Sequence, residues 1–353
     1  MCLNRWVRWA GQEVSDQAAG DPAALPGLDR LNNLVRTVRT PEFAGITFHE
    51  VLARSALNKV PAASAVPFNW TVNPYRGCSH GCVYCFARGT HTYLDLDAGD
   101  DFDRQIIVKI NVAEVLAREL RRPSWTHEPV ALGTNTDPYQ RAEGRYRLMP
   151  GIITGLAESG TPFSILTKGT TARRDLGLLS AAAETVPVGM GVSIALTDET
   201  VHEALEPGTP TPRARLELVR SIVAAGLPCQ VLVAPVLPMI TDSDEQLDRL
   251  LGQIAAAGAT GATVFALHLR PGAREWFWRY LSVHHPHLVD TYAKLYRGGS
   301  YVSRSFATDL SHRSSALLRR HGLQGRAGAM LRWPSSRAGP GSEASPADEP
   351  ALF

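Results

Sequence analysis

The chain has 353 residues, of which 44% are hydrophobic, enough for one large domain or two of ordinary size. Thirty-six Lys and Arg against 34 Asp and Glu leave a formal charge of +2, so no global field points to nucleic acid or an anionic membrane, although a local basic groove is still permitted. The start of the chain lacks the apolar run of a secretory signal, and no segment reaches the ~20 apolar residues of a membrane span, which predicts a cytoplasmic protein.

The first 65 residues differ in pattern from the rest of the chain. They mix charged and small residues with two stretches of helical spacing, "DRLNNLVRTV" and "ITFHEVLARSALNKV". We expect these stretches to be helical, and residues 1–65 to form an N-terminal extension that packs on the main domain.

Between residues 66 and 270, short β-branched runs alternate with amphipathic segments, a pattern typical of βα units around a parallel sheet or barrel. The expected strands are 68–72, 129–133, 163–167, 188–196, 230–236 and 262–267. The expected helices are 112–121, 150–158, 173–184, 212–225 and 243–256. This alternation predicts an α/β fold, a (βα)6 partial TIM barrel whose chemistry gathers at the C-terminal ends of the strands.

Two segments follow the barrel. Residues 271–333 contain helical stretches that we expect to cover its open side. Residues 334–353 are rich in Pro, Ser, Gly and Ala without any apolar period, which predicts a disordered tail.

Three of the five cysteines lie close together in "GCSHGCVYCFAR", directly after the first expected strand. Cys78, Cys82 and Cys85 have the spacing C-x3-C-x2-C. A structural zinc site closes four ligands, usually as two separated pairs, and the sequence has no second pair of that kind. A disulfide would leave one thiol over, and the cytosol disfavours it.

An iron-sulfur cluster explains three clustered cysteines better. Four thiolates saturate a 4Fe-4S cubane, whereas three leave one iron able to bind a substrate or cofactor. Tyr84 would shield such a cluster, and Gly77 and Gly81 would let the loop wrap closely around it. We therefore interpret this loop as a catalytic metal site.

These motifs resemble the radical S-adenosylmethionine (SAM) enzymes. Their C-x3-C-x2-C motif follows the first strand of a (βα)6 partial barrel, as it does here. "NPYRGCSHGCVYCFAR", "GTNTDPYQRAE" and "LTKGT" look more narrowly like the branch related to spore photoproduct lyase, and the resemblance extends over about residues 47–266. It implies a 4Fe-4S cluster, SAM, and a protein reductant such as flavodoxin or ferredoxin.

The resemblance also implies four SAM contacts. Thr136 and Asp137 match the polar positions after the second strand that bind the SAM amino group, although Asp-Pro is also a common turn. Lys168, after the third strand, matches a lysine that contacts the SAM carboxylate. Ser193, on the fourth strand, matches a serine near the SAM ribose or carboxylate, or is a satisfied core hydroxyl.

One position departs from the lyase branch. Spore photoproduct lyase has a hydrogen-donating cysteine at the end of its second strand, where this chain has Thr134. Cys229 begins the fifth expected strand, at the far end of the barrel, and is best interpreted as a small buried hydrophobe.

The function expected from the resemblance is reductive cleavage of SAM to a 5′-deoxyadenosyl radical that abstracts hydrogen from a substrate the sequence does not specify. Two alternatives stay open: a DNA repair enzyme of the photoproduct lyase type, and a non-catalytic protein that holds an iron-sulfur cluster or zinc.

Overall fold

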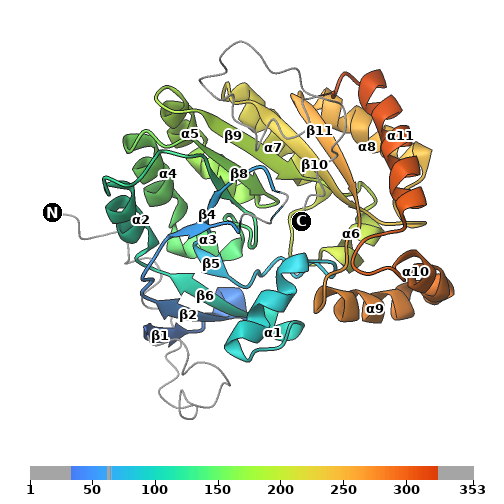
Figure 1. Cartoon of the computed structure of the whole chain (residues 1–353), viewed down its shortest axis with the longest axis horizontal. Coiled ribbons are helices and arrows are strands. Elements are labelled where there is room, and N and C mark those ends of the chain that lie inside the picture. Colours follow the sequence, from blue (N-terminus) through green and yellow to red (C-terminus); the bar gives the residue numbers. More distant parts are fainter. Residues whose placement is uncertain (1–32, 62–63, 65, 325–353) are drawn as a thin grey trace.

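A seven-stranded sheet forms the centre of the computed structural model, which describes residues 33–61, 64 and 66–324 (Figure 1). Its parallel strands follow one another in chain order: β4 (Trp70–Val72), β7 (Val130–Leu132), β8 (Phe163–Thr167), β9 (Val188–Ser193), β10 (Cys229–Val236) and β11 (Gly261–Ala266). A short strand, β3 (Leu57–Lys59), pairs antiparallel with β4. All six expected barrel strands are thus present, in the expected order.

Helices connect successive parallel strands and cover the outer face of the sheet (Figure 1). They are α2 (Val112–Leu120), α4 (Met149–Glu158), α5 (Leu176–Ala183), α7 (Pro212–Ala224) and α8 (Asp244–Ala256). Local sequence explains their starts, because the Thr211 side chain caps α7 and Ser243 forms a capping box with Gln246 at α8. The predicted (βα)6 partial barrel is confirmed.

The main core lies between the strands and these helices. Strand residues such as Ile165 and Val192 are fully buried, as are helix residues such as Leu116, Ile152 and Leu251. Both faces of a parallel strand are covered, so the strands read as nearly continuous apolar runs. This packed wall holds the strand ends in fixed positions.

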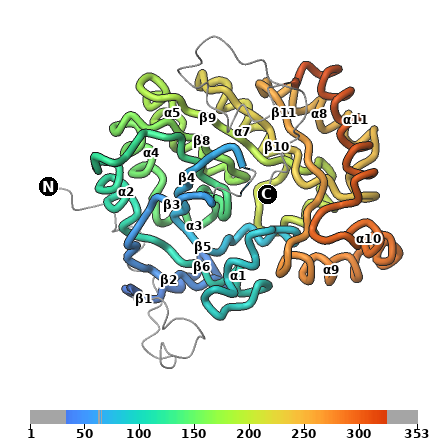
Figure 2. Tube along the Cα trace, viewed as in Figure 1, coloured from blue at the N-terminus to red at the C-terminus, as the bar shows by residue number. Residues whose placement is uncertain are grey.

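A second sheet corrects the expectation for the N-terminal extension. Its order is β1 (Leu34–Val38), β2 (Thr47–Val51), β6 (Gln105–Lys109) and β5 (Tyr75–Arg76) (Figures 1 and 2). The helical stretches expected within residues 33–60 were wrong, because β2 pairs with a strand on each side and is buried along its whole length. Tertiary pairing therefore overrides the helical spacing. Residues 1–32 lie outside the described part of the chain.

The expected helices after the barrel are present as α9 (Ala273–His284), α10 (Val289–Leu295) and α11 (Arg304–Arg320). Helix α11 packs on α8 and β11, while α9 lies against the 3-10 segment η4 (Phe86–Leu94) that follows the cysteines. Phe277, Tyr280 and Tyr292 of this C-terminal cover share one apolar cluster with Cys82 and Tyr84. The disorder expected for residues 334–353 falls outside the described residues.

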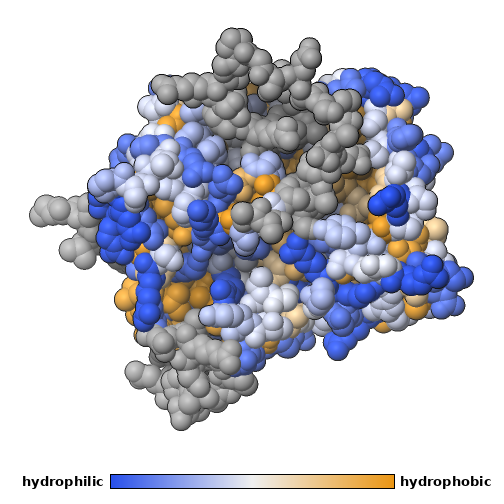
Figure 3. All heavy atoms as spheres, viewed as in Figure 1, coloured by the Kyte–Doolittle hydropathy of each residue, from blue (hydrophilic) through white to orange (hydrophobic). Residues whose placement is uncertain are grey.

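Hydrophilic side chains cover much of the outer rim of the face shown in Figure 3. Within residues 33–324, leaving out 62, 63 and 65, no helix is both long and apolar enough to cross a bilayer.

Candidate active site

A cavity of about 400 Å³ lies at the C-terminal ends of the parallel strands, within the size range of small-molecule sites. Its walls come from the cysteine loop and from the ends of β7, β8, β9, β10 and β11. The structure brings every residue predicted for the site to this one cavity: Cys78, Cys82, Cys85, Thr136, Asp137, Lys168 and Ser193.

The cysteine loop runs from the end of β5 to the start of η4. Gly77 and Gly81 have φ values of +81° and +62°, which a side chain would strain. A Cβ on Gly77 would also lie 2.9 Å from the carbonyl oxygen of Gln105. The Cys78 backbone N–H donates to the Phe102 carbonyl over 2.9 Å, which ties the loop to the segment before β6.

The three thiols fit an iron-sulfur cluster in their chemistry. They are free cysteines that line one cavity, and burial raises the pKa of each, so the bare thiols keep their protons near neutral pH. Thiolates of a cubane bind different irons and stand further apart than the ligands of one ion. Within the described residues, no group of three or more His, Cys, Asp or Glu is arranged to hold a single metal ion.

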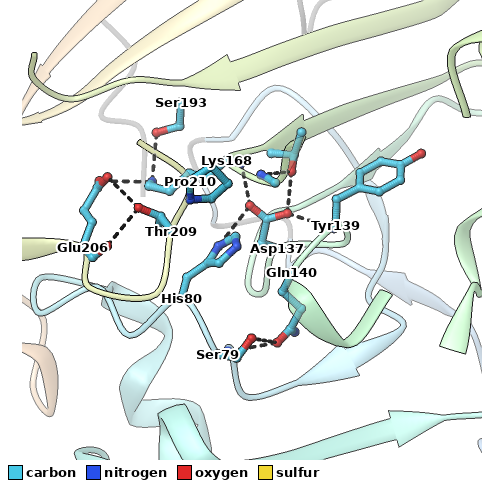
Figure 4. Close-up of polar contacts among 12 residues, drawn as sticks. Ser79, His80, Asp137, Tyr139, Gln140, Lys168, Ser193, Glu206, Thr209 and Pro210 are labelled. Carbon is cyan, nitrogen blue, oxygen red and sulfur yellow. Dashed lines mark hydrogen bonds and ion pairs between the residues drawn. The ribbon is translucent and has the colours of Figure 1, made fainter. Parts of the chain in front are cut away.

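The carboxylate of Asp137 is already surrounded by donors (Figure 4). Oδ1 accepts hydrogen bonds from the Tyr139 backbone N–H over 2.9 Å and from Thr167 Oγ1 over 2.5 Å. Oδ2 accepts one from the Lys168 backbone N–H over 2.6 Å and lies 3.4 Å from His80 Nδ1. Since two carboxylate oxygens offer about four lone-pair sites, Asp137 is best placed to position the β7 and β8 strand ends. Its predicted contact with the SAM amino group stays a prediction.

The side chains of Lys168 and Ser193 meet inside the cavity (Figure 4). Lys168 Nζ donates to Ser193 Oγ over 2.9 Å and lies 3.9 Å from Glu206 Oε1. Thr136, by contrast, donates its hydroxyl to the Tyr75 carbonyl over 3.1 Å. Lys168 and Ser193 thus place an ammonium and a hydroxyl side by side, an arrangement that suits a carboxylate ligand.

Glu206 is a member of this site that the sequence interpretation missed. It is fully buried at the end of α6 (Glu199–Leu205) and accepts hydrogen bonds from the Tyr84 hydroxyl and from Arg215 Nη2. Burial opposes its ionisation, but Arg215 and Lys168 outweigh that effect and lower the pKa of Glu206 to about 2. Because Tyr84 lies inside the cysteine loop, Glu206 connects that loop to Lys168.

A sequence signal for this network did exist. Arg215 falls on the apolar face of α7, in line with Leu218, Val219 and Ile222, and is only 1% exposed. An arginine in that position needs an acidic partner, since a buried charge is costly when unpaired. Besides Glu206, it donates Nη1 to the Ser193 carbonyl over 2.9 Å.

Gly208, in the segment between α6 and α7, packs directly on the cysteine loop. Its N–H donates to the His80 carbonyl over 2.9 Å, and a Cβ would overlap the carbonyl oxygen of Ser79. We expect Gly208→Ala to lower the free energy of unfolding by about 1–3 kcal/mol and to reduce iron retention, because backbone must move. Urea unfolding and iron analysis measure the two effects.

Gly155→Ala is the matched control, because nothing lies within 4 Å of a Cβ at that position of α4. It should leave iron retention unchanged and, as an alanine inside a helix, should not destabilise the protein. Equal iron retention in the two variants would contradict this assignment for Gly208.

The rest of the cavity wall is mainly apolar and aromatic. Phe68, Phe86, Phe265 and Tyr301 line it, together with His268, which follows β11 by two residues. Within the described part of the chain, the buried atom His268 Nε2 finds no hydrogen-bond partner, and the same is true of Thr134 Oγ1. Burial lowers the pKa of His268 to about 4, so its ring is neutral at pH 7.

A partial (βα)6 barrel with three cysteines at its mouth defines the class, and the comparisons with known proteins agree. The sequence matches the Radical SAM superfamily over residues 72–251, half of the chain, and the protein belongs to that superfamily. It is therefore a radical SAM enzyme, and membership implies SAM and a 4Fe-4S cluster.

Relatives and solved structures extend this result. The Mycobacterium tuberculosis protein Rv2578c is 62% identical over 320 residues, covering 90% of this chain and 94% of that protein. The Methanocaldococcus jannaschii protein MJ0683 is 21% identical over 195 residues, covering 55% of this chain and 69% of that one. A structure of spore photoproduct lyase complexed with dinucleoside spore photoproduct covers 78% of this chain and 79% of its own, with a TM-score of 0.57. Its 16% identity makes this a similarity of fold.

Proposed function

We propose that Cys78, Cys82 and Cys85 hold a 4Fe-4S cluster, and that the same cavity binds SAM and the substrate. The observation that supports this most is that all three thiols, Lys168 and Ser193 line a single cavity at the strand ends. When bound, the cluster would supply the electron that cleaves SAM to methionine and a 5′-deoxyadenosyl radical.

The protein's own residues would bind and orient SAM. Lys168 Nζ and Ser193 Oγ would share the SAM carboxylate, since they already lie 2.9 Å apart. Asp137 would act indirectly: it accepts a hydrogen bond from the Lys168 backbone N–H and so positions Lys168. Glu206 would limit the swing of the Lys168 side chain, being 3.9 Å from its ammonium group.

The substrate would lie against the aromatic side of the cavity. There His268 Nε2 and Thr134 Oγ1 offer hydrogen bonds, and the aromatic rings would keep water away from a radical. Within the described residues, the lining has no cysteine beyond Cys78, Cys82 and Cys85, and Cys229 lies outside it. We therefore do not extend the proposal to DNA photoproduct repair, which needs a thiol hydrogen donor in the branch that this chain resembles.

Electron paramagnetic resonance of the reduced protein, with and without SAM, tests this proposal. A flavodoxin or ferredoxin is the reductant we propose in the cell, and dithionite replaces it in the experiment. SAM should change the spectrum of the cluster, because three thiolates leave one iron open to it. A spectrum unaffected by saturating SAM would favour a closed, non-catalytic cluster.

Lys168→Met should weaken SAM binding by about 10- to 100-fold, the value of a hydrogen bond to a charged group. Isothermal titration of the anaerobic, cluster-loaded protein measures this. Ser193→Ala should weaken binding less, because it removes a neutral donor.

The control for Lys168→Met is Lys294→Met, which changes an exposed lysine on α10 outside the cavity lining. It should leave SAM affinity unchanged. Equal SAM affinities for wild type and Lys168→Met would show that Lys168 does not bind SAM.

A further inference from the structure

Arg88 follows the last cysteine of the loop by three positions and is completely buried. Its Nε and Nη2 donate to the Cys82 carbonyl over 3.1 and 3.0 Å. Nη1 donates to the carbonyls of Ala98 and Gly99 over 3.2 and 2.8 Å, and Nη2 also donates to the Asp103 carboxylate over 2.8 Å. Since a guanidinium has five N–H groups, this set of acceptors uses all of them.

Aromatic rings complete the surroundings of this guanidinium. Its central carbon lies 5.3 Å from the ring centre of Phe102 and 4.9 Å from that of Trp276, which belongs to α9. Gly99 makes room for Trp276, because a Cβ there would lie 2.6 Å from the indole. The C-terminal cover thus reaches the cysteine loop through Arg88.

The Cys82 carbonyl is the point where these contacts act on the cysteine loop. It also accepts the Cys85 backbone N–H over 3.2 Å, so the turn between the two cysteines and the Arg88 side chain share one acceptor. Arg88 carries a positive charge, and Asp103 is the carboxylate paired with it. Arg88 therefore combines a geometric constraint on the loop with a fixed positive charge behind it.

We propose that Arg88 is a positioning residue of the cluster site, held in place by Asp103 and Trp276. It fixes the Cys82–Cys85 turn for metal binding, and its charge makes the bound cluster easier to reduce. The second effect follows because reduction adds negative charge, and nearby charges and hydrogen bonds set cluster potentials. This inference rests on the proposed function.

The test compares Arg88→Gln, Arg88→Lys and Asp103→Asn with wild type after anaerobic reconstitution. Iron per folded chain, the rate of iron loss to a chelator and the midpoint potential of the cluster are measured. Arg88→Gln should lose iron at least about tenfold faster, with Arg88→Lys in between, because an ammonium keeps the charge but not the fork of donors. The potential should fall in Arg88→Gln and rise in Asp103→Asn, since these changes remove opposite charges.

Arg104→Gln is the control, because Arg104 lies next to Asp103 but its side chain is 62% exposed. It should match wild type in all three measurements. The inference would be overturned if Arg88→Gln lost iron at the wild-type rate. It would also be overturned if the potentials of Arg88→Gln and Asp103→Asn did not move in opposite directions. If Arg88→Gln does not fold, Arg88→Lys and Asp103→Asn decide it. A wild-type protein that binds no cluster would refute the proposed function itself, before any variant is compared.

Discussion

Cys82→Ala should abolish the production of 5′-deoxyadenosine from SAM, with a loss of at least about 1000-fold, because an electron-transfer cofactor without one of three ligands is not retained in working form. Cys82 is 7% exposed and lies between Cys78 and Cys85 on the cavity wall. Iron and sulfide analysis of the reconstituted variant should show most of the cluster lost. Cys78→Ala and Cys85→Ala should behave alike, since the three thiols act as one set.

Cys229→Ala controls for the loss of a buried thiol as such. Cys229 is fully buried at the start of β10, outside the cavity lining, where its role is packing. The variant should keep wild-type iron content and activity while losing about 1–2 kcal/mol of unfolding free energy. Full activity in Cys82→Ala, or a similar loss of iron in Cys229→Ala, would contradict the assignment of the ligands.

Glu206→Ala should lower the unfolding free energy by about 3–5 kcal/mol, the usual cost of leaving the partner of a buried ion pair without its counter-charge. The partner is Arg215, which is 1% exposed and has Glu206 as its carboxylate. Tyr84 would lose its acceptor as well, so the cysteine loop should also loosen. Urea unfolding at pH 7 gives the stability, and iron retention reports the loop.

Glu206 should also make stability depend on acid. Its pKa is lowered from 4.5 to about 2 in the folded chain, so the stabilisation is complete above pH 4.5 and is lost as pH falls towards 2. A shift of this size corresponds to about 3 kcal/mol. Glu206→Gln should remove this loss between pH 4.5 and 2.

Glu217→Gln on α7 is the control for both measurements, since Glu217 pairs with Arg220 at the surface and is 50% exposed. An exposed pair of this kind contributes little to stability. If Glu206→Ala unfolds with the wild-type free energy, or if the stability of Glu206→Gln depends on acid as the wild type does, the Glu206 network does not stabilise the protein.

The barrel could be predicted from sequence because its strands are buried on both faces and its helices have one apolar face. Strand β8 has the predicted bounds, and the cysteine loop follows the first barrel strand as expected. The N-terminal strands could not be predicted in the same way. Strand β2 depends on pairing with β6, which lies more than fifty residues later in the chain.

In the candidate site, too, local sequence predicts some residues, whereas others depend on contacts between distant segments. Lys168 and Ser193 could be placed at the site from sequence, because they stand at strand ends and match positions of the radical SAM enzymes. Glu206 and Arg88 could not, because each acts through contacts between distant segments: Glu206 with Tyr84, 122 residues away, and Arg88 with Trp276 on α9. For Asp137, the sequence located the side chain at the cavity, whereas the structure showed that its oxygens already have donors.

Whether the protein cleaves SAM is best tested by the yield of 5′-deoxyadenosine, measured by mass spectrometry. The protein is kept anaerobic, carries about four iron and four sulfide per chain, and is mixed with SAM and a reductant. We expect 5′-deoxyadenosine and methionine in equal amounts from the wild type, and neither from Cys82→Ala. Cluster-loaded, SAM-bound wild type that yields no 5′-deoxyadenosine would refute the proposed function.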